Sequence, residues 1–335
     1  MTTEEKNDKA AERRDDKTTV TRDEKKRVKR LAKLIFLHGF SDHCNAYYTF
    51  FPSLAARGIE VFAFDQRGWG RSVRTPSDRG ASGPTSQVLA DLRSILSSHI
   101  PSTTASTSTA ATSTSSSNSN SSSNVPIFLM GHSMGAGEIL SYAARGDAQQ
   151  KEHIRGYLAE APLFAFPRET EPWKLTVAAG RLMSKMTPGK QLVRKLEPAL
   201  MSRDPVVCSN FAKDPLCHDT GTLEGLAGML QRTADLRSGR WSVPAGISLW
   251  VGHGTEDKVT SFEAAQAWVQ SAQAVDKTFR VYRGWYHKLH AEPGEDHKIF
   301  AKDVADWILA RCNTRSPRDS VDQVAPPIDI PTAKL

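Results

Sequence analysis

The segment FLMGHSMGAGEIL, residues 128–140, restricts the fold of this 335-residue chain more than any other feature. An apolar run leads into Gly131, Ser133 and Gly135, which spell G-x-S-x-G, and a helical pattern follows. Because glycine is used where the backbone needs room, the segment predicts a strand, a sharp turn that carries the serine, and a helix. Average composition produces G-x-S-x-G by chance in roughly one such chain in ten, so the interpretation depends on the neighbouring elements.

Short apolar runs alternate with helical patterns along the rest of the chain. This alternation predicts an α/β fold, with a mostly parallel sheet and helices on both of its faces. One stretch, residues 166–244, interrupts it with helical patterns and no convincing strand, and in a doubly wound fold such an insertion is expected to form a cap over the carboxyl ends of the strands. Strands are predicted over 33–39, 59–65, 125–130, 154–162, 246–252 and 278–284, and helices over 45–58, 86–100, 134–146, 261–273 and 297–312.

Three regions are predicted to lie outside the folded part of the chain. Residues 1–32 are dense in charge of both signs, residues 101–124 contain no side chain larger than Asn or Thr, and residues 313–335 are polar and proline-bearing. None of them can bury enough apolar surface to offset the entropy lost on ordering. We therefore expect a disordered charged arm, a disordered Ser/Thr-rich insertion and a disordered tail around one domain at 33–312.

Composition argues against several classes of protein. The four cysteines are far apart and form no C-x-x-C pair, which favours reduced thiols in an intracellular protein. The N-terminus lacks the apolar segment of a secretory signal, and no apolar run approaches the roughly 18 residues of a membrane-spanning helix. The net charge is +7, but no helix-turn-helix, zinc-finger or RNP signature accompanies it. We expect a cytoplasmic protein without a nucleic-acid partner, and the sequence leaves the oligomeric state unknown.

A serine on such a turn can act as a nucleophile only with a base, and the base needs an acid to orient it. With this kind of turn, the acid and then the histidine follow the serine along the chain, each in a loop after a strand. Asp257 follows the strand predicted at 246–252, with Glu256 as the alternative acid. His287 and His290 both follow the last predicted strand, so both are candidates for the base.

Two backbone amides are candidates for an oxyanion hole. Met134 N–H begins the helix after the serine, where the helix dipole favours negative charge. Phe40 N–H follows the first predicted strand, in the stretch LHGF. Such a site needs no metal and no organic cofactor, and the spacing of the paired histidines and Cys217 matches no usual set of metal ligands.

Several stretches together resemble the monoacylglycerol lipase family of α/β-hydrolases. They are LHGFSDHCNAYYTFFPSLAARGIEVFAFDQRGWGRS, GHSMGAG, SRDPVVCSNFAKDPLCHDTGTLEGLAGMLQ, GTEDKV and YRGWYHKLHAE. The resemblance implies the α/β-hydrolase fold over about 33–311, apart from the Ser/Thr-rich insertion. It also implies an enzyme that cleaves the ester of a monoacylglycerol to fatty acid and glycerol through an acyl-enzyme, and that is cytosolic or loosely attached to lipid surfaces.

By position, the resemblance makes Ser133 the nucleophile, Asp257 the acid and His287 the base. His290 becomes a neighbour of the site, and Phe40 and Met134 supply the oxyanion amides. Family members usually carry an N-terminal strand pair before the first predicted strand, and residues 1–32 hold no apolar run that could form it. We therefore expect that strand pair to be missing.

Two other classes of function stay open on the sequence alone. A lysophospholipase or a short-chain carboxylesterase would use the same triad with another pocket, and a non-catalytic scaffold could keep the fold. The stretch WKLTVAAGRLMSKM, residues 173–186, also has two interpretations. It is either a cap helix packed on the core or a helix that contacts the surface of a membrane or a lipid droplet.

Overall fold

The computed structural model describes residues 28–100 and 125–313, and the predicted insertion and most of the predicted arm and tail lie outside these residues. Six strands form one sheet in the order β2-β1-β3-β4-β7-β8, and every neighbouring pair is parallel. The prediction of a mostly parallel sheet is confirmed. The strands are β1 (Ala32–Leu37), β2 (Ile59–Ala63), β3 (Ile127–His132), β4 (Ile154–Glu160), β7 (Ser248–Gly254) and β8 (Asp276–Tyr282).

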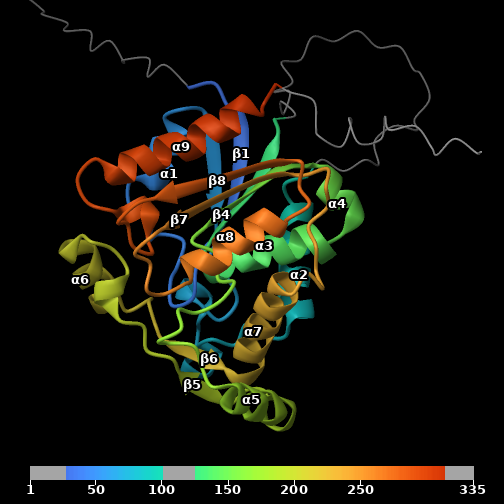
Figure 1. Ribbon diagram of the computed structural model, residues 1–335, viewed down its shortest axis with the longest axis vertical. Coiled ribbons are helices and arrows are strands. Elements are labelled where there is room, and N and C mark those ends of the chain that lie inside the picture. Colours follow the sequence, from blue (N-terminus) through green and yellow to red (C-terminus); the bar gives the residue numbers. More distant parts are fainter. Residues whose placement is uncertain (1–27, 101–124, 314–335) are drawn as a thin grey trace, which may run out of the picture.

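Helices cover both faces of this sheet, as Figure 1 shows. The alternation of side chains along β1 divides the core: Leu34 and Phe36 belong to the cluster under α1 and α9, and Ile35 and Leu37 to the cluster under α2, α3 and α8. The helices are α1 (Phe50–Ala55), α2 (Thr85–Ser97), α3 (Met134–Arg145), α4 (Ala148–Glu152), α8 (Phe262–Ser271) and α9 (Asp296–Ala310), and short 3₁₀ turns lie at Gly70–Ser72, Pro76–Asp78, Pro198–Leu200 and Leu289–Ala291.

One predicted helix is shorter than expected. The pattern over 45–58 gives only α1, which begins at Phe50. Tyr48 has a φ of +45°, a left-handed conformation that no α-helix can contain. The helix also ends earlier than expected, at Ala55, and Gly58, with a φ of +82°, turns the chain into β2.

The segment between β4 and β7, residues 161–247, is here called the cap segment. It contains α5 (Lys174–Met186), α6 (Pro205–Lys213) and α7 (Leu223–Arg237), and it lies below the sheet in Figure 1. The expectation of no strand in this segment was wrong, because β5 (Gln191–Val193) and β6 (Thr220–Thr222) form an antiparallel pair. Each is three residues long, too short to show an alternating pattern.

A buried ion pair ties the cap segment to the sheet domain. Arg232 of α7 donates to the Glu138 carboxylate of α3 at 3.1 Å, and both side chains are almost fully buried. Burying two charges is costly unless they are paired, so removing one partner would leave the other uncompensated. The pair therefore holds α7 in one position above the helix that follows Ser133.

No helix in the described parts of the chain combines the length and apolar character needed to cross a bilayer. Among the described residues, β2 forms one edge of the sheet and β8 the other. No strand precedes β1 within residues 28–31, and residues 1–27 lie outside the described part.

The order of the strands places a crevice at the carboxyl ends of β1 and β3. From β1 the chain moves to β2 on one side and later returns to β3 on the other. In open α/β sheets, ligands bind at the point where the order reverses in this way. Phe40 follows β1 and Ser133 follows β3, so two of the predicted site residues lie at this crevice.

The two glycines around Ser133 allow β3 and α3 to cross closely. A Cβ on Gly131 would lie 2.4 Å from the backbone of Gly135, and a Cβ on Gly135 would lie 2.5 Å from the carbonyl oxygens of Leu37 and His38. Real side chains do not approach backbone atoms this closely. The glycines of G-x-S-x-G are therefore required by packing between β1, β3 and α3.

We predict that Gly135→Ala lowers the free energy of unfolding by roughly 1–3 kcal/mol, because the new methyl group must displace backbone atoms of the sheet. Gly137→Ala is the matched control on the same helix, since its Cβ would meet nothing closer than 3.9 Å. That control is expected to be neutral or stabilising by roughly 0.5–1 kcal/mol, because alanine favours helix over glycine. Urea denaturation of both variants checks this, and equal effects would contradict it.

Candidate active site

Ser133 lies at the turn between β3 and α3 in a strained backbone conformation. Its φ is +55° and its ψ is −114°, values that non-glycine residues adopt only where the surroundings enforce them. Two hydrogen bonds enforce them here: Ser133 N–H donates to the Glu160 carbonyl at 2.8 Å, and Leu163 N–H donates to the Ser133 carbonyl at 3.3 Å. The serine is therefore held by β3, α3 and the end of β4 together.

Asp257 follows β7 and is buried in a cluster of donors. One carboxylate oxygen accepts the Val259 N–H at 2.7 Å and the Thr260 N–H at 2.9 Å. The other accepts the Thr260 hydroxyl at 2.8 Å and faces His287 Nδ1 at 2.8 Å and His253 Nε2 at 3.2 Å. Burial alone would raise the pKa of Asp257, but the two imidazoles outweigh burial and hold that pKa well below its usual range. Asp257 is therefore ionised.

His287 lies in the loop after β8 and is 3% exposed. Its Nδ1 is hydrogen-bonded to Asp257, so its Nε2 is the nitrogen that can accept a proton. Ser133 and His287 line the same cavity. No hydrogen bond joins Ser133 Oγ to His287 in the described part of the chain, and such contacts are often longer before substrate binds.

The alternative residues lie in different environments. Glu256 is half-exposed and pairs with Lys258 at 3.4 Å, away from the imidazole. His290 is fully buried, and its Nδ1 lies 2.7 Å from Glu160 Oε1, which also accepts the His290 N–H at 3.1 Å. His290 does not line the cavity that contains Ser133. The structure thus brings Asp257 and His287 together and places His290 behind them.

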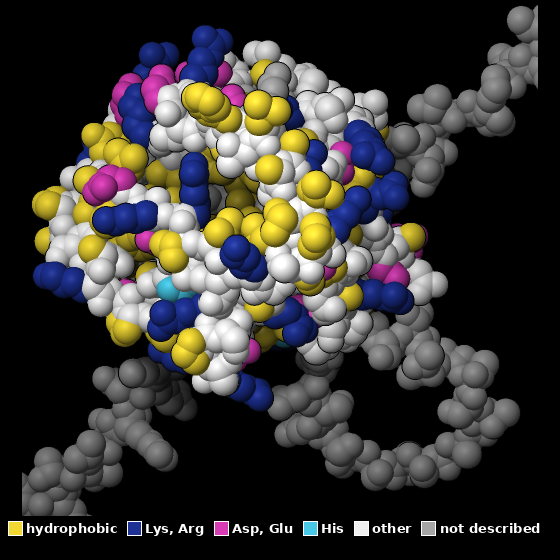
Figure 2. Space-filling model, turned by 90° about the horizontal axis from the view of Figure 1, so that it is seen from below, with side chains coloured by type: hydrophobic (Ala, Val, Ile, Leu, Met, Phe, Trp, Pro, Cys, Tyr) yellow, Lys and Arg dark blue, Asp and Glu magenta, His cyan; other side chains and the backbone are white. Residues whose placement is uncertain are grey.

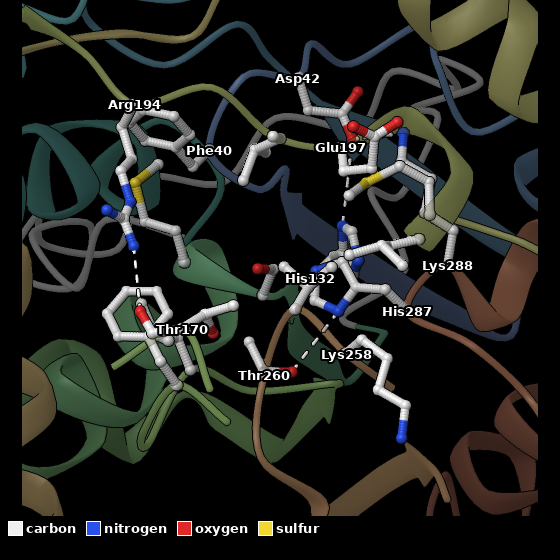
Figure 3. Close-up of a pocket in the computed structure, with 18 of the residues that line it drawn as sticks. Phe40, Asp42, His132, Thr170, Arg194, Glu197, Lys258, Thr260, His287 and Lys288 are labelled. Atoms are coloured by element: carbon white, nitrogen blue, oxygen red, sulfur yellow. Dashed lines mark hydrogen bonds and ion pairs between the residues drawn. The ribbon is translucent and has the colours of Figure 1, made fainter. Parts of the chain in front are cut away.

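The cavity above Ser133 has a volume of about 170 Å³ and lies between the cap segment and the carboxyl ends of the strands (Figure 3). Its wall is mainly apolar, which suits a hydrocarbon chain. The apolar lining residues are Phe40, Met134, Leu163, Phe166, Leu196, Leu200, Met201, Phe211, Met229 and Val259.

The two expected oxyanion amides belong to residues of this lining. Phe40 and Met134 both border the cavity beside Ser133. Within the described residues, neither amide donates to a protein acceptor. Neither N–H group is therefore already used by a protein acceptor among these residues, as an oxyanion hole requires.

Sequence reasoning missed a buried ion pair in the wall of the cavity. Lys288 Nζ donates to Asp42 Oδ2 at 2.8 Å, and both side chains are almost completely buried (Figure 3). Burial alone would lower the pKa of Lys288, but the Asp42 carboxylate outweighs burial and raises that pKa above its usual value. The mainly apolar wall of the cavity therefore also contains charged groups. Lys288 follows His287 directly and gave no separate signal in the sequence.

One group of side chains has the types that bind metals. Ligand atoms of His43, Asp214 and Cys217 lie within 4.8 Å of one another. His43 Nε2 is hydrogen-bonded to Asp214 at 2.9 Å, so these two groups already satisfy each other. None of the three belongs to the lining of the cavity above Ser133.

Comparisons with known proteins identify a family and several similar proteins. A family model described as serine aminopeptidase, S33 (Hydrolase_4), matches residues 29–294. A protein of Schizosaccharomyces pombe, named as a candidate monoglyceride lipase, is 33% identical over 306 residues, which cover 91% of this chain and 74% of that protein. The monoglyceride lipase of Saccharomyces cerevisiae is 23% identical over 293 residues, which cover 85% of this chain and 86% of the relative.

Solved structures share the fold. A soluble variant of the Saccharomyces cerevisiae monoglyceride lipase, in complex with a substrate analogue, matches with a TM-score of 0.71 at 20% identity, over 85% of this chain and 88% of that one. The monoacylglycerol lipase of Paleococcus ferrophilus matches with a TM-score of 0.68 at 22% identity, over 84% and 97%. The chain therefore belongs to the Hydrolase_4 family (serine aminopeptidase, S33) of α/β-hydrolases, and the predicted resemblance to the monoacylglycerol lipases of that fold is confirmed.

Proposed function

We propose that this protein is a serine hydrolase that cleaves monoacylglycerols to fatty acid and glycerol. The observation that carries the proposal is the placement of Ser133 and the Asp257–His287 pair at one mainly apolar cavity with charged groups in its wall. A monoacylglycerol likewise combines one hydrocarbon chain with one polar alcohol. The names of the relatives in two yeasts support the same substrate.

In the proposed acylation, Ser133 Oγ attacks the ester carbonyl carbon while His287 Nε2 takes the serine proton. Asp257 keeps the other imidazole proton on Nδ1 and stabilises the imidazolium that forms. The Phe40 and Met134 amides donate to the oxyanion, and each such donor is worth roughly 3 kcal/mol in comparable sites. The bond to glycerol then breaks, and His287 returns its proton to the glycerol oxygen.

In the proposed deacylation, water replaces glycerol. His287 takes a proton from this water as the water attacks the acyl carbon. The bond to Ser133 Oγ breaks, the serine regains its proton from His287, and a fatty acid is released, which becomes a carboxylate by giving its remaining proton to solvent. His287 carries the proton in each transfer to or from Ser133, and the proposed cycle uses no metal or organic cofactor.

We further propose that the cap segment contacts a lipid surface. Trp173 and Leu175 are 80% and 81% exposed, and Leu182 and Met186 of α5 are 63% and 71% exposed. Figure 2 looks onto the cap segment and shows apolar side chains around a hollow, with Lys and Arg side chains among them. This combination is typical of helices that lie on membranes, and it supports a cytoplasmic protein that attaches to lipid droplets or intracellular membranes.

The first prediction from the proposed function concerns the triad. Ser133→Ala and His287→Ala are each expected to lower kcat by several orders of magnitude, whereas His290→Ala is expected to cost much less because it does not reach the cavity. Ser133→Ala also prevents labelling by a fluorophosphonate probe, and its circular-dichroism spectrum stays unchanged. Substantial turnover by Ser133→Ala, or a greater loss in His290→Ala than in His287→Ala, would refute the assignment.

The second prediction concerns the substrate. Initial rates in detergent micelles are expected to be higher for monooleoylglycerol than for dioleoylglycerol and trioleoylglycerol, because a cavity of about 170 Å³ accepts one chain more readily than two or three. Oleoyl lysophosphatidylcholine and a short p-nitrophenyl ester are the competing substrates. Equal rates on trioleoylglycerol would contradict a cavity that accepts one chain. Turnover of the short ester alone would replace the proposal by a carboxylesterase, and a preference for the phospholipid would replace it by a lysophospholipase.

The third prediction concerns the lipid surface. Replacing Leu175 and Leu182 together by Asp is expected to reduce sedimentation with phosphatidylcholine vesicles, because charged groups oppose insertion of α5 between headgroups. Val275→Asp is the control, since Val275 is also apolar and 64% exposed but precedes β8 at the opposite end of the sheet. Equal sedimentation of both variants and the unmodified protein would show that α5 does not bind the vesicles.

A further inference from the structure

A second cavity lies within the cap segment, beside the one above Ser133. Its volume is about 150 Å³. Phe166, Arg194 and Met229 belong to the walls of both cavities, so these side chains form the boundary between them. The second cavity is otherwise bordered by side chains from α5, β5, α7 and the segment before α5, namely Pro172, Thr176, Val177, Gly180, Arg181, Leu192, Leu223, Leu226, Ala227 and Leu230.

The charges of this second cavity have one sign. Its wall contains two arginines, Arg181 and Arg194, and no Asp or Glu. Among the described residues, neither guanidinium forms an ion pair, whereas Arg203 and Arg232 of the same cap segment both have carboxylate partners. Both arginines are exposed and unpaired within the described part of the chain, so an apolar cavity bordered by them favours a ligand with a hydrocarbon part and an anionic part.

Arg194 has the more specific position of the two. Its guanidinium lies 5.7 Å from the centre of the Phe166 ring and donates to the Thr170 carbonyl at 3.2 Å (Figure 3). One hydrogen bond to a carbonyl leaves further N–H donors of the planar guanidinium available, and such donors match the two oxygens of a carboxylate. Because Arg194 borders both cavities, a carboxylate can meet it from either side.

We propose that the second cavity binds a long-chain carboxylate, with the hydrocarbon chain between α5 and α7 and the carboxylate on Arg194 and Arg181. A long-chain carboxylate is also the product of the proposed hydrolysis. The inference that the enzyme holds its own product rests on the proposed function. The inference that the second cavity binds a long-chain carboxylate does not. Fatty acid in this cavity would contact the boundary side chains Phe166, Arg194 and Met229. It would therefore inhibit the entry of a new acyl chain into the cavity above Ser133.

The test measures binding separately from catalysis. The protein used is full-length Ser133→Ala, and the measurement is displacement of a fluorescent long-chain fatty acid by monomeric oleate or by oleyl alcohol. Oleate is expected to bind more tightly than the alcohol. Adding Arg194→Gln is expected to weaken oleate about tenfold, because a charge-assisted hydrogen bond is lost, and to leave oleyl alcohol unchanged. Arg237→Gln is the matched control, since this exposed arginine of α7 is outside both walls.

Two further variants locate the ligand. Ala227→Trp fills the second cavity and is expected to abolish oleate binding, whereas Leu200→Trp narrows only the cavity above Ser133 and is expected to leave it unchanged. Circular dichroism verifies that both variants fold. Arg194→Gln tests oleate binding by a replacement at an exposed residue, which leaves the packing of the core intact. Equal affinities for oleate and oleyl alcohol, no effect of Arg194→Gln, or loss of binding only in Leu200→Trp would each overturn the proposal. Absence of monooleoylglycerol hydrolysis in the unmodified protein would refute the proposed function and leave the binding result standing.

Discussion

The close crossing of α3 over the sheet at Gly131 and Gly135 is the contact on which the site depends. It brings the start of α3 against the carbonyl groups at the end of β1, next to Ser133 with its positive φ. Phe40 lies just beyond the same end of β1, so the distance between the serine and that amide is set by the same contact. A bulkier residue at either glycine would therefore disturb the fold and the candidate site together.

Two buried carboxylates hold two neighbouring histidines in different environments. Asp257 and Glu160 each hold a histidine through Nδ1, and the two histidines are only three positions apart in the chain. His287 borders the cavity, whereas His290 lies in the core against the Tyr47 ring, with ring centres 4.4 Å apart. Lys288, between them, donates its backbone N–H to the Met201 carbonyl at 2.7 Å. The loop of the proposed base is thereby attached to the cap segment.

The sequence predicted the sheet, its flanking helices and the residues that meet at its carboxyl edge, because those features depend on local patterns and on the order of strands. Ser133, Asp257 and His287 each follow a strand that an apolar run made visible. Other features depend on partners that are distant in the chain. Asp42 gives no signal until Lys288 is placed beside it, and β5 exists only because β6 pairs with it. The choice between His287 and His290 likewise required the family resemblance, since both follow the same strand.

The parallel sheet described above also has a consequence for how the chain folds. No two neighbouring strands are joined by a hairpin, and the pairing of β1 with β3 brings Lys33 next to Ile127. Such pairing closes a long loop, and the chain loses conformational entropy before the contacts between the strands can offset the loss. Chains with these contacts therefore fold slowly. The turn at Ser133 requires β1, β3 and β4 to be in place, and the geometry of the candidate site therefore arises late, with the completion of the sheet. In newly made chains, the apolar strands would stay exposed for longer than the helices. The chains are most prone to aggregation while these strands are exposed.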